Sequence, residues 1–204
     1  MAEQHAPPNH HANYPGFAGV AGLVAALSMA FGRTGDARLA VGLSGLGPGD
    51  EVVDIGCGPG VAVRYAAGMG AMVTGVDPAP VMLRVARLFT SQRAKVRYVK
   101  GAAEAIPLPE GSASVVWSIA TVHHWSNIDA GLREVRRVLL PGGRLVAMER
   151  RAEPGAQGHG SHGWTNEQAT AFADRCREHG FTDVRLERAT IGRRSTVSVV
   201  ASAP

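Results

Sequence analysis

The chain has 204 residues, of which 45% are hydrophobic and 19% are charged. This is enough apolar material for one packed core, so the composition excludes a largely disordered protein. The formal net charge is +4. The basic residues are spread over the whole chain instead of gathering with aromatic residues, which disfavours a nucleic-acid partner.

The N-terminal part combines a polar stretch with an apolar one. Residues 1–16 are rich in His, Pro and Asn. They predict either a loose terminus or a flap over a substrate, and the flap would include Tyr14. Residues 17–31 are almost wholly apolar. This segment is shorter than the roughly 20 residues needed to span a bilayer, and the positive charge of a secretory signal does not precede it. We therefore expect a buried or interfacial helix over a ligand cleft. With a helix at 34–43, residues 1–44 form the predicted helical lid or substrate segment, ahead of one domain at 45–204.

From residue 51 onward, apolar runs alternate with helical patterns. Strands are expected at 51–55, 71–76, 96–99, 113–119 and 143–149, and helices at 60–68, 79–90 and 128–139. This alternation predicts parallel βαβ units with helices on both faces of a sheet. A helix at 165–179 with Thr165 as its N-cap follows, and then two strands at 183–190 and 195–201 joined as a hairpin. The expected fold is a doubly wound α/β fold, with a mostly parallel seven-stranded sheet and an antiparallel C-terminal strand.

The cysteine content bears on the cellular compartment. There are two cysteines, Cys57 and Cys176, and their positions suggest neither a disulfide framework nor a zinc motif. A reducing compartment fits this usage, so we expect a cytoplasmic protein with no membrane partner.

The main motif is Val52–Gly60, V-V-D-I-G-C-G-P-G, in which a strand runs into a glycine-rich turn. Glycines allow a ligand to approach the backbone closely, and doubly wound folds bind ligands at the carboxyl end of the first strand. Val61 stands where the dinucleotide fingerprint requires glycine, which counts against NAD or FAD. Asp54 can face a cation, and Asp77 at the next strand end can accept both hydroxyls of a ribose. The motif indicates a nucleoside with a positively charged tail.

These residues resemble the class I S-adenosylmethionine-dependent methyltransferases, in the branch that methylates small molecules. The resemblance continues in Val99–Pro107, Val115–Ser118, His123–Trp125 and Leu132–Leu145. It covers residues 45–150 closely and 165–201 loosely. It implies S-adenosyl-L-methionine as the cofactor, held by a set of residues from the strand ends and loops: Asp54, Gly56, Gly58, Gly60, Asp77, Pro78, Ala103, Glu104 and Ser118. One departure is Ala102, where the family often has an Asp that accepts a hydrogen bond from adenine.

The histidines after the fourth predicted strand are the candidate catalytic residues. Methyl transfer to a hydroxyl needs an aligned nucleophile and a general base, and the pKa of histidine suits that task. We expect His124 to be the base and His123 to pack or orient, since adjacent side chains on extended backbone point in opposite directions. The candidate substrate-binding residues are the aromatic and histidine side chains Tyr14, Trp125, His159, His162 and Trp164. Core burial is the alternative for the tryptophans, and a mobile surface loop is the alternative for the two histidines.

The sequence therefore predicts methyl transfer to a small molecule, with a hydroxyl oxygen as acceptor. A sugar or polysaccharide precursor is the acceptor we expect. Of the 21 basic residues, 19 are arginine, and this skew is typical of GC-rich genomes such as those of actinobacteria. The alternatives are C- or N-methylation in quinone or amine metabolism, RNA methylation, and a non-catalytic cofactor-binding protein. A divalent metal such as Mg²⁺ is a further alternative, with histidines and Glu149 as ligands. The expected partners are the small-molecule acceptor and, as an option, a second copy of the chain in a homodimer.

Overall fold

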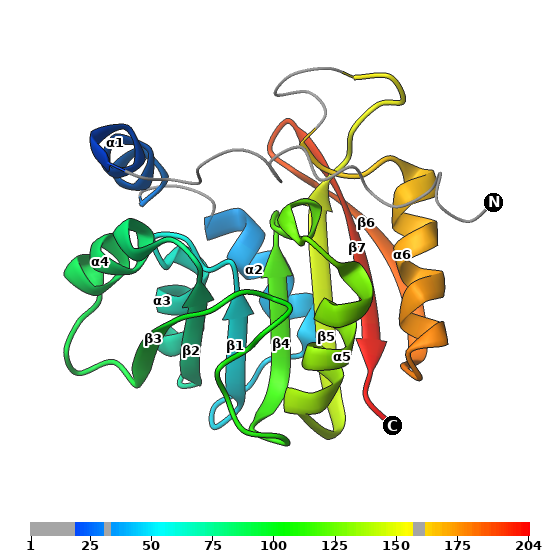
Figure 1. Cartoon of the computed structure of the whole chain (residues 1–204), viewed down its shortest axis with the longest axis horizontal. Coiled ribbons are helices and arrows are strands. Elements are labelled where there is room, and N and C mark those ends of the chain that lie inside the picture. Colours follow the sequence, from blue (N-terminus) through cyan, green and yellow to red (C-terminus); the bar gives the residue numbers. More distant parts are fainter. Residues whose placement is uncertain (1–18, 31–33, 157–161) are drawn as a thin grey trace.

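A seven-stranded sheet in the order β3-β2-β1-β4-β5-β7-β6 forms the centre of the protein (Figure 1). The structure is a computed structural model that describes residues 19–30, 34–156 and 162–204. The strands are β1 (Glu51–Ile55), β2 (Met72–Asp77), β3 (Val96–Lys100), β4 (Ala113–Ile119), β5 (Leu139–Arg150), β6 (Thr182–Ile191) and β7 (Arg194–Ser202). Strands β1 to β5 pair in parallel, and β7 runs antiparallel to both β5 and β6. The predicted mostly parallel sheet with an antiparallel C-terminal strand is confirmed.

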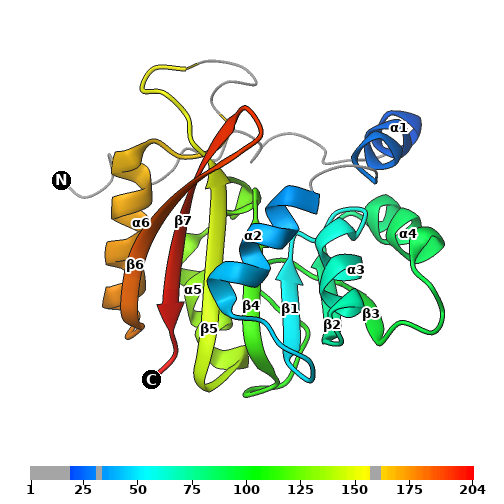
Figure 2. The same ribbon diagram turned by 180° about the vertical axis from the view of Figure 1, so that it is seen from behind.

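Helices cover both faces of this sheet. They are α1 (Gly19–Met29), α2 (Thr34–Ser44), α3 (Val61–Gly68), α4 (Pro80–Phe89), α5 (Ile128–Val138) and α6 (Asn166–Glu178), with a short 3₁₀ helix η2 (Val122–His124). Helices α5 and α6 lie on one face (Figure 1), and α2, α3 and α4 lie on the other (Figure 2). Helix α1 stands beside α4, above the carboxyl ends of the parallel strands. Within the described part of the chain, no helix is long and apolar enough to cross a membrane.

The amphipathic pattern of α5 explains how one face of the sheet is packed. Leu132, Val135 and Val138 recur at helical spacing and are fully buried, in the same apolar cluster as Leu145 of β5. On the opposite face the Nε1 of the fully buried Trp117 donates a hydrogen bond to Ser44 Oγ at 3.3 Å, which fixes the end of α2 against β4. The sheet is thereby held rigidly from both sides, and its strand ends provide a firm base for a site.

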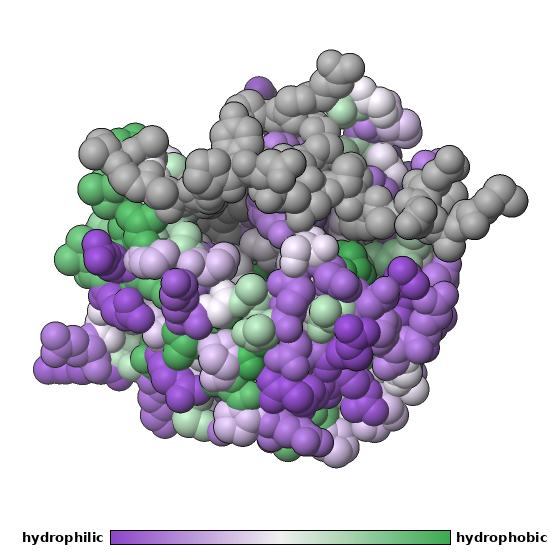
Figure 3. All heavy atoms as spheres, viewed as in Figure 1, coloured by the Kyte–Doolittle hydropathy of each residue, from purple (hydrophilic) through white to green (hydrophobic). Residues whose placement is uncertain are grey.

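The outer surface is less uniform. Figure 3 shows hydrophilic side chains over α5 and α6 and hydrophobic ones around α1 and α4. The apolar side chains exposed on α1 and α4 are Leu23, Val24, Leu27 and Leu88. Helix α1 therefore presents apolar side chains to solvent as well as to the interior.

Two local predictions can be compared with the structure directly. Thr165 is the N-cap of α6 as predicted, and it forms a capping box with Gln168. Strand β5 begins at Leu139, earlier than the predicted start at residue 143. The reason is that Leu139 is already extended and pairs with Ala113, so the strand begins as soon as α5 ends.

Candidate active site

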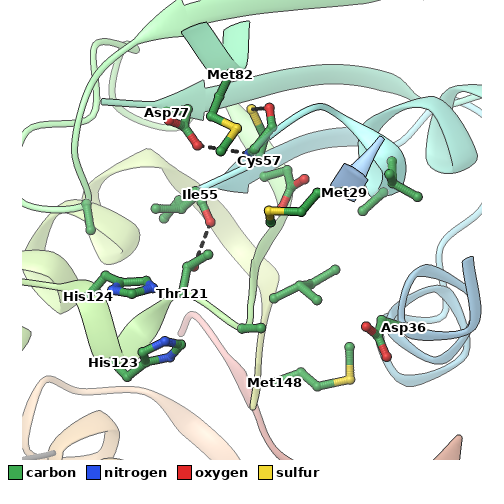
Figure 4. A pocket seen from close by; sticks show the side chains of 18 of the residues that line it. Met29, Asp36, Ile55, Cys57, Asp77, Met82, Thr121, His123, His124 and Met148 are labelled. Atoms are coloured by element: carbon green, nitrogen blue, oxygen red, sulfur yellow. Dashed lines mark hydrogen bonds between the residues drawn. The ribbon is translucent and has the colours of Figure 1, made fainter. Parts of the chain in front are cut away.

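A cavity of about 1050 Å³ opens at the carboxyl ends of β1, β2, β4 and β5. Figure 4 shows Asp77 in one part of it and His123 and His124 in another, with Ile55 and Thr121 between them. We call the part around Asp54, Asp77 and the Gly56–Gly58 loop the carboxylate end. We call the part around His123, His124, His162 and Glu149 the histidine end.

The glycine-rich loop after β1 forms the wall of the carboxylate end. Gly56 and Gly58 have φ angles of 70° and 52°, in the left-handed region that favours glycine. A Cβ on Gly56 would lie 2.5 Å from Thr121 Cγ2, so this position has no room for a side chain. A Cβ on Gly58 would meet no atom within 4 Å, because that side of the loop is open. A ligand can therefore approach the backbone of Gly58 directly.

Asp77 connects this loop to the start of α4. Its Oδ2 accepts a hydrogen bond from the Gly58 N–H at 2.9 Å, and its Oδ1 accepts one from the Ala79 N–H at 2.8 Å. Burial raises the pKa of the Asp77 carboxyl above its usual value, and the two backbone hydrogen bonds only partly offset this. A carboxylate offers about four lone-pair positions, so acceptor positions remain for the hydroxyls of a ribose.

Asp54 is the unusual carboxylate of the site. It is 2% exposed, and its carboxylate makes no hydrogen bond or ion pair with any other residue that the structure describes. Burial and the nearby charge of Asp77 raise its pKa to about 8. Two neighbouring acids in a buried site favour a cationic ligand, which would stabilise their ionised forms. The residues present therefore fit the positively charged nucleoside that the sequence resemblance implies.

At the histidine end, two buried side chains from distant parts of the sequence are paired. His123 Nδ1 lies 2.9 Å from Glu149 Oε2, and Glu149 Oε1 accepts the backbone N–H of His123 at 3.3 Å. The side chains are 6% and 0% exposed. The rings of His124 and His162 lie close by, with centroids 3.9 Å and 5.7 Å from that of His123. Among the residues described, no three histidine, cysteine or acidic side chains are arranged to hold a metal ion.

Helix α1 forms part of the cavity wall, and Arg64 ties the helix to the glycine-rich loop. Gly22, Ala25 and Met29 of α1 line the cavity. Arg64 donates one hydrogen bond to the Ala30 carbonyl at the end of this helix, at 3.0 Å, and another to the Pro59 carbonyl at 2.6 Å. The apolar helix expected at 17–31 thus lies over a cavity.

The structure brings most of the predicted site residues together. Those that line the cavity are Asp54, Gly56, Gly58, Asp77, Pro78, Ala103, Glu104, His123, His124, Trp125 and His162.

Three predicted site residues lie outside its lining, namely Gly60, Ser118 and Trp164. Gly60 has a positive φ and packs against Tyr98, so its place is the turn into α3. Trp164 is fully buried, with its ring centroid 4.8 Å from that of Phe172. It thus occupies a core position, which is the alternative given above for this tryptophan. Tyr14 and His159 lie outside the described residues, so their roles stay predictions.

Sequence reasoning missed Thr121, which joins two strand ends. The Thr121 hydroxyl donates its one proton to the Ile55 carbonyl at 2.9 Å. In the 2.7 Å contact between the hydroxyls of Ser118 and Thr121, Ser118 is therefore the donor. Ser118 thus contacts Thr121, which lines the cavity, and does not line the cavity itself. The preceding residue, Ala120, has a φ of 56°, a conformation that is strained for alanine. No local motif signals this arrangement, because Thr121 meets Ile55 only after the sheet has formed.

Glu104, predicted to lie near an adenine edge, also has a structural role. Its Oε1 accepts hydrogen bonds from the Asn127 N–H at 3.0 Å and from Ser126 Oγ at 2.9 Å. These contacts fix the segment between η2 and α5. Glu104 thus connects the loop after β3 to the histidine-bearing loop after β4.

Comparison with known proteins agrees with this geometry. Residues 53–147 match a family model described as a methyltransferase domain. The chain is 36% identical over 112 residues to demethylmenaquinone methyltransferase from Tropheryma whipplei, covering 55% of this chain and 46% of the relative. It is 36% identical over 106 residues to malonyl-[acyl-carrier protein] O-methyltransferase from Serratia marcescens, covering 52% and 40%. The matches thus span less than half the length of these relatives.

A solved structure shows the same fold. Phosphoethanolamine N-methyltransferase 2 from Haemonchus contortus, in complex with S-adenosyl-L-methionine, superposes with a TM-score of 0.73 at 19% identity. The superposition covers 90% of this chain and 57% of that one. The family match over residues 53–147, the fold and the carboxylate end of the cavity agree with the resemblance of the sequence to the class I S-adenosylmethionine-dependent methyltransferases.

Proposed function

We propose that the protein transfers a methyl group from S-adenosyl-L-methionine to a hydroxyl oxygen of a small molecule, with a histidine as general base. The observation that carries this proposal is the distribution of chemistry along one cavity. Carboxylates suited to a cationic nucleoside occupy one part, and imidazoles suited to proton removal occupy another (Figure 4). The bound cofactor would supply an electrophilic methyl group on a positively charged sulfur.

The chain's own residues would perform the remaining tasks. Asp77 would accept the ribose hydroxyls, and Asp54 would face the positive charge of the cofactor. Glycines at 56 and 58 would let the cofactor lie against the loop backbone. In the division that we propose, the segment up to residue 44 contributes α1 as a roof over the cavity, and residues 45–204 form the methyltransferase domain.

The acceptor that we propose is a sugar or another polyhydroxylated metabolite. A cavity of about 1050 Å³ leaves space for an acceptor beside a cofactor. The polar residues of its lining beyond the carboxylate end, such as His124, His162 and Thr196, offer hydrogen-bonding groups for hydroxyls.

A second candidate is methylation of a quinone-type ring. It is favoured by the similarity to demethylmenaquinone methyltransferase and by apolar groups in the cavity lining, among them Met29 and Met148. Methylation at carbon needs an activated carbon and makes less demand on a histidine base. The fate of the methyl group therefore distinguishes the two candidates.

The test starts with titration calorimetry of S-adenosylmethionine and S-adenosylhomocysteine, and we expect micromolar binding of both. The protein is then incubated with isotopically methyl-labelled cofactor and separate pools of sugars, quinols and amines, and the products are identified by mass spectrometry and NMR. A labelled methyl ether from the sugar pool is the expected result. A labelled C-methyl quinol would overturn the hydroxyl proposal in favour of the second candidate. Binding without any turnover would instead favour a non-catalytic cofactor-binding protein.

A further inference from the structure

Glu149 is a buried carboxylate for which the cofactor has no evident use. It lies at the carboxyl end of β5 and lines the cavity with a side chain that is 0% exposed. Its hydrogen-bond partners are the two donors of a single residue, the ring and the backbone N–H of His123. A buried carboxylate is costly unless it is paired, so its place against one imidazole requires an explanation.

We propose that Glu149 is a positioning residue that makes His123, and not His124, the general base of the reaction. This inference rests on the proposed methyl transfer to a hydroxyl. It assigns to His123 the proton transfer that the sequence alone assigns to His124. Both imidazoles lie on the same side of the cavity (Figure 4), so the choice between them depends on their partners.

The contact with Glu149 selects the tautomer of His123. An ionised carboxylate only accepts hydrogen bonds, so the ring must donate through Nδ1 across the 2.9 Å contact. In the neutral imidazole, Nε2 is then unprotonated and free to accept a proton. Because His123 lines the cavity, Nε2 is the nitrogen available to a bound hydroxyl.

The proton and charge balance of the step is complete with these residues. The hydroxyl oxygen forms a bond to the methyl carbon, and the carbon–sulfur bond breaks with its electron pair going to sulfur. The hydroxyl proton moves to Nε2 of His123. The imidazolium that results carries its charge next to the buried carboxylate of Glu149, which stabilises it.

His124 differs from His123 in its surroundings. It is exposed, whereas His123 is 5% exposed. The contacts of its ring and of its backbone N–H with one carboxylate also hold His123 in a single orientation, which efficient proton transfer requires. Other charged or titratable groups line the same cavity: His124 on η2, His162 ahead of α6, Arg150 on β5, and Arg194 on β7 with its partner Asp36 on α2.

The first test requires no acceptor. Histidine ¹⁵N NMR of the protein with S-adenosylhomocysteine bound should show His123 with its proton on Nδ1. In Glu149→Gln, which keeps the size of the side chain but removes its charge, the population of His123 with its proton on Nδ1 should fall, because an amide can also donate a hydrogen bond to Nδ1. The matched control is Glu178→Gln on the exposed surface of α6, which should leave the His123 signal unchanged. A proton on Nε2 in the wild type, or an unchanged tautomer population in Glu149→Gln, would overturn the pairing.

The second test measures turnover with the hydroxylated acceptor identified above. We expect Glu149→Gln and His123→Ala each to lower kcat by roughly 100-fold or more, with cofactor affinity within about twofold of the wild type. Glu149→Asp should recover part of the loss, and His124→Ala should raise the acceptor KM more than it lowers kcat. Equal losses in His123→Ala and His124→Ala, or wild-type kcat in Glu149→Gln, would overturn the assignment while leaving hydroxyl methylation in place. If the NMR signature is present but no hydroxyl is methylated, the proposed function fails and the catalytic role of the pair fails with it.

Discussion

The two ends of the cavity are built in different ways. The carboxylate end comes from a short part of the chain, since Asp54, Gly58 and Asp77 lie on two neighbouring strand ends joined by one helix. The histidine end joins η2 to the end of β5 and to a residue ahead of α6, so it extends from His123 to His162 in the sequence. The first end therefore depends on local sequence, and the second depends on the assembly of the sheet. This difference suggests that cofactor binding and acceptor chemistry can be separated by mutation.

The largest expected effect separates the two ends. Asp77→Ala should weaken S-adenosylmethionine binding by about 100-fold or more, because it removes a buried acceptor and leaves the Gly58 and Ala79 N–H groups without their partner. His123→Ala should leave that affinity within about twofold while lowering turnover. Calorimetry of both variants measures the contrast, with Asp174→Ala on the surface of α6 as control. Comparable loss of cofactor binding in both variants would show that the two ends do not act independently.

The next effect concerns pH at the carboxylate end. The pKa of Asp54 in the folded protein, about 8, lies above its ordinary value of 3.8. The folded protein therefore holds a proton on Asp54 that the unfolded chain releases above about pH 4. The free energy of unfolding falls for this reason as pH rises from about 4 to about 8. Asp54→Asn should remove the loss, so the variant should be a few kcal/mol more stable than the wild type at pH 8. Thermal unfolding from pH 5 to pH 9 measures this difference.

Asp54→Asn should also change how cofactor binding depends on pH. A cation binds the ionised carboxylate better, so wild-type affinity for S-adenosylmethionine should rise about tenfold or more between pH 6 and pH 8. The dependence should be much weaker in the variant. If affinity rises equally in both proteins, Asp54 does not face the charge of the cofactor.

A smaller effect is expected from crowding the wall of the histidine end. A Cβ on Gly131 of α5 would lie 2.6 Å from Cζ3 of Trp125, which lines the cavity next to His124. Gly131→Ala should lower the free energy of unfolding by roughly 1 kcal/mol, because the clash outweighs the helix propensity of alanine. Turnover should fall about fivefold as Trp125 moves. In the control, Gly42→Ala, the new Cβ meets nothing within 4 Å, and this variant should be slightly stabilised. A stabilised and fully active Gly131→Ala would show that Trp125 can move without consequence.

The smallest expected effect concerns the ion pair between Arg194 and Asp36, which lie 3.4 Å apart and both line the cavity. The Arg194 side chain is 43% exposed, so the pair contributes at most about 1 kcal/mol to stability. Arg194→Ala should raise the acceptor KM a few-fold and leave cofactor affinity unchanged. Steady-state kinetics with Arg193→Ala as control tests this. An unchanged acceptor KM would place the acceptor away from this part of the cavity.

The fold and the carboxylate end could be predicted from the sequence because their signals are local. Alternating apolar runs mark the strands, and the motif from Val52 to Gly60 carries its own turn. The histidine end could be predicted only in part. His123 and His124 follow a strand in the sequence, but nothing near them reveals that Glu149 will lie behind one ring and leave the other exposed. Trp164 shows the same limit, because the residues around it do not indicate whether its ring faces the cavity or Phe172.

The double hydrogen bond of Arg64 has a consequence for the timing of turnover. One guanidinium holds both the Ala30 carbonyl at the end of α1 and the Pro59 carbonyl of the glycine-rich loop. Displacement of α1 would therefore remove a support of the loop at the same moment. We therefore expect exchange of the spent cofactor and displacement of the helix to be a single event, and the pace of the catalytic cycle to be governed by the release of product.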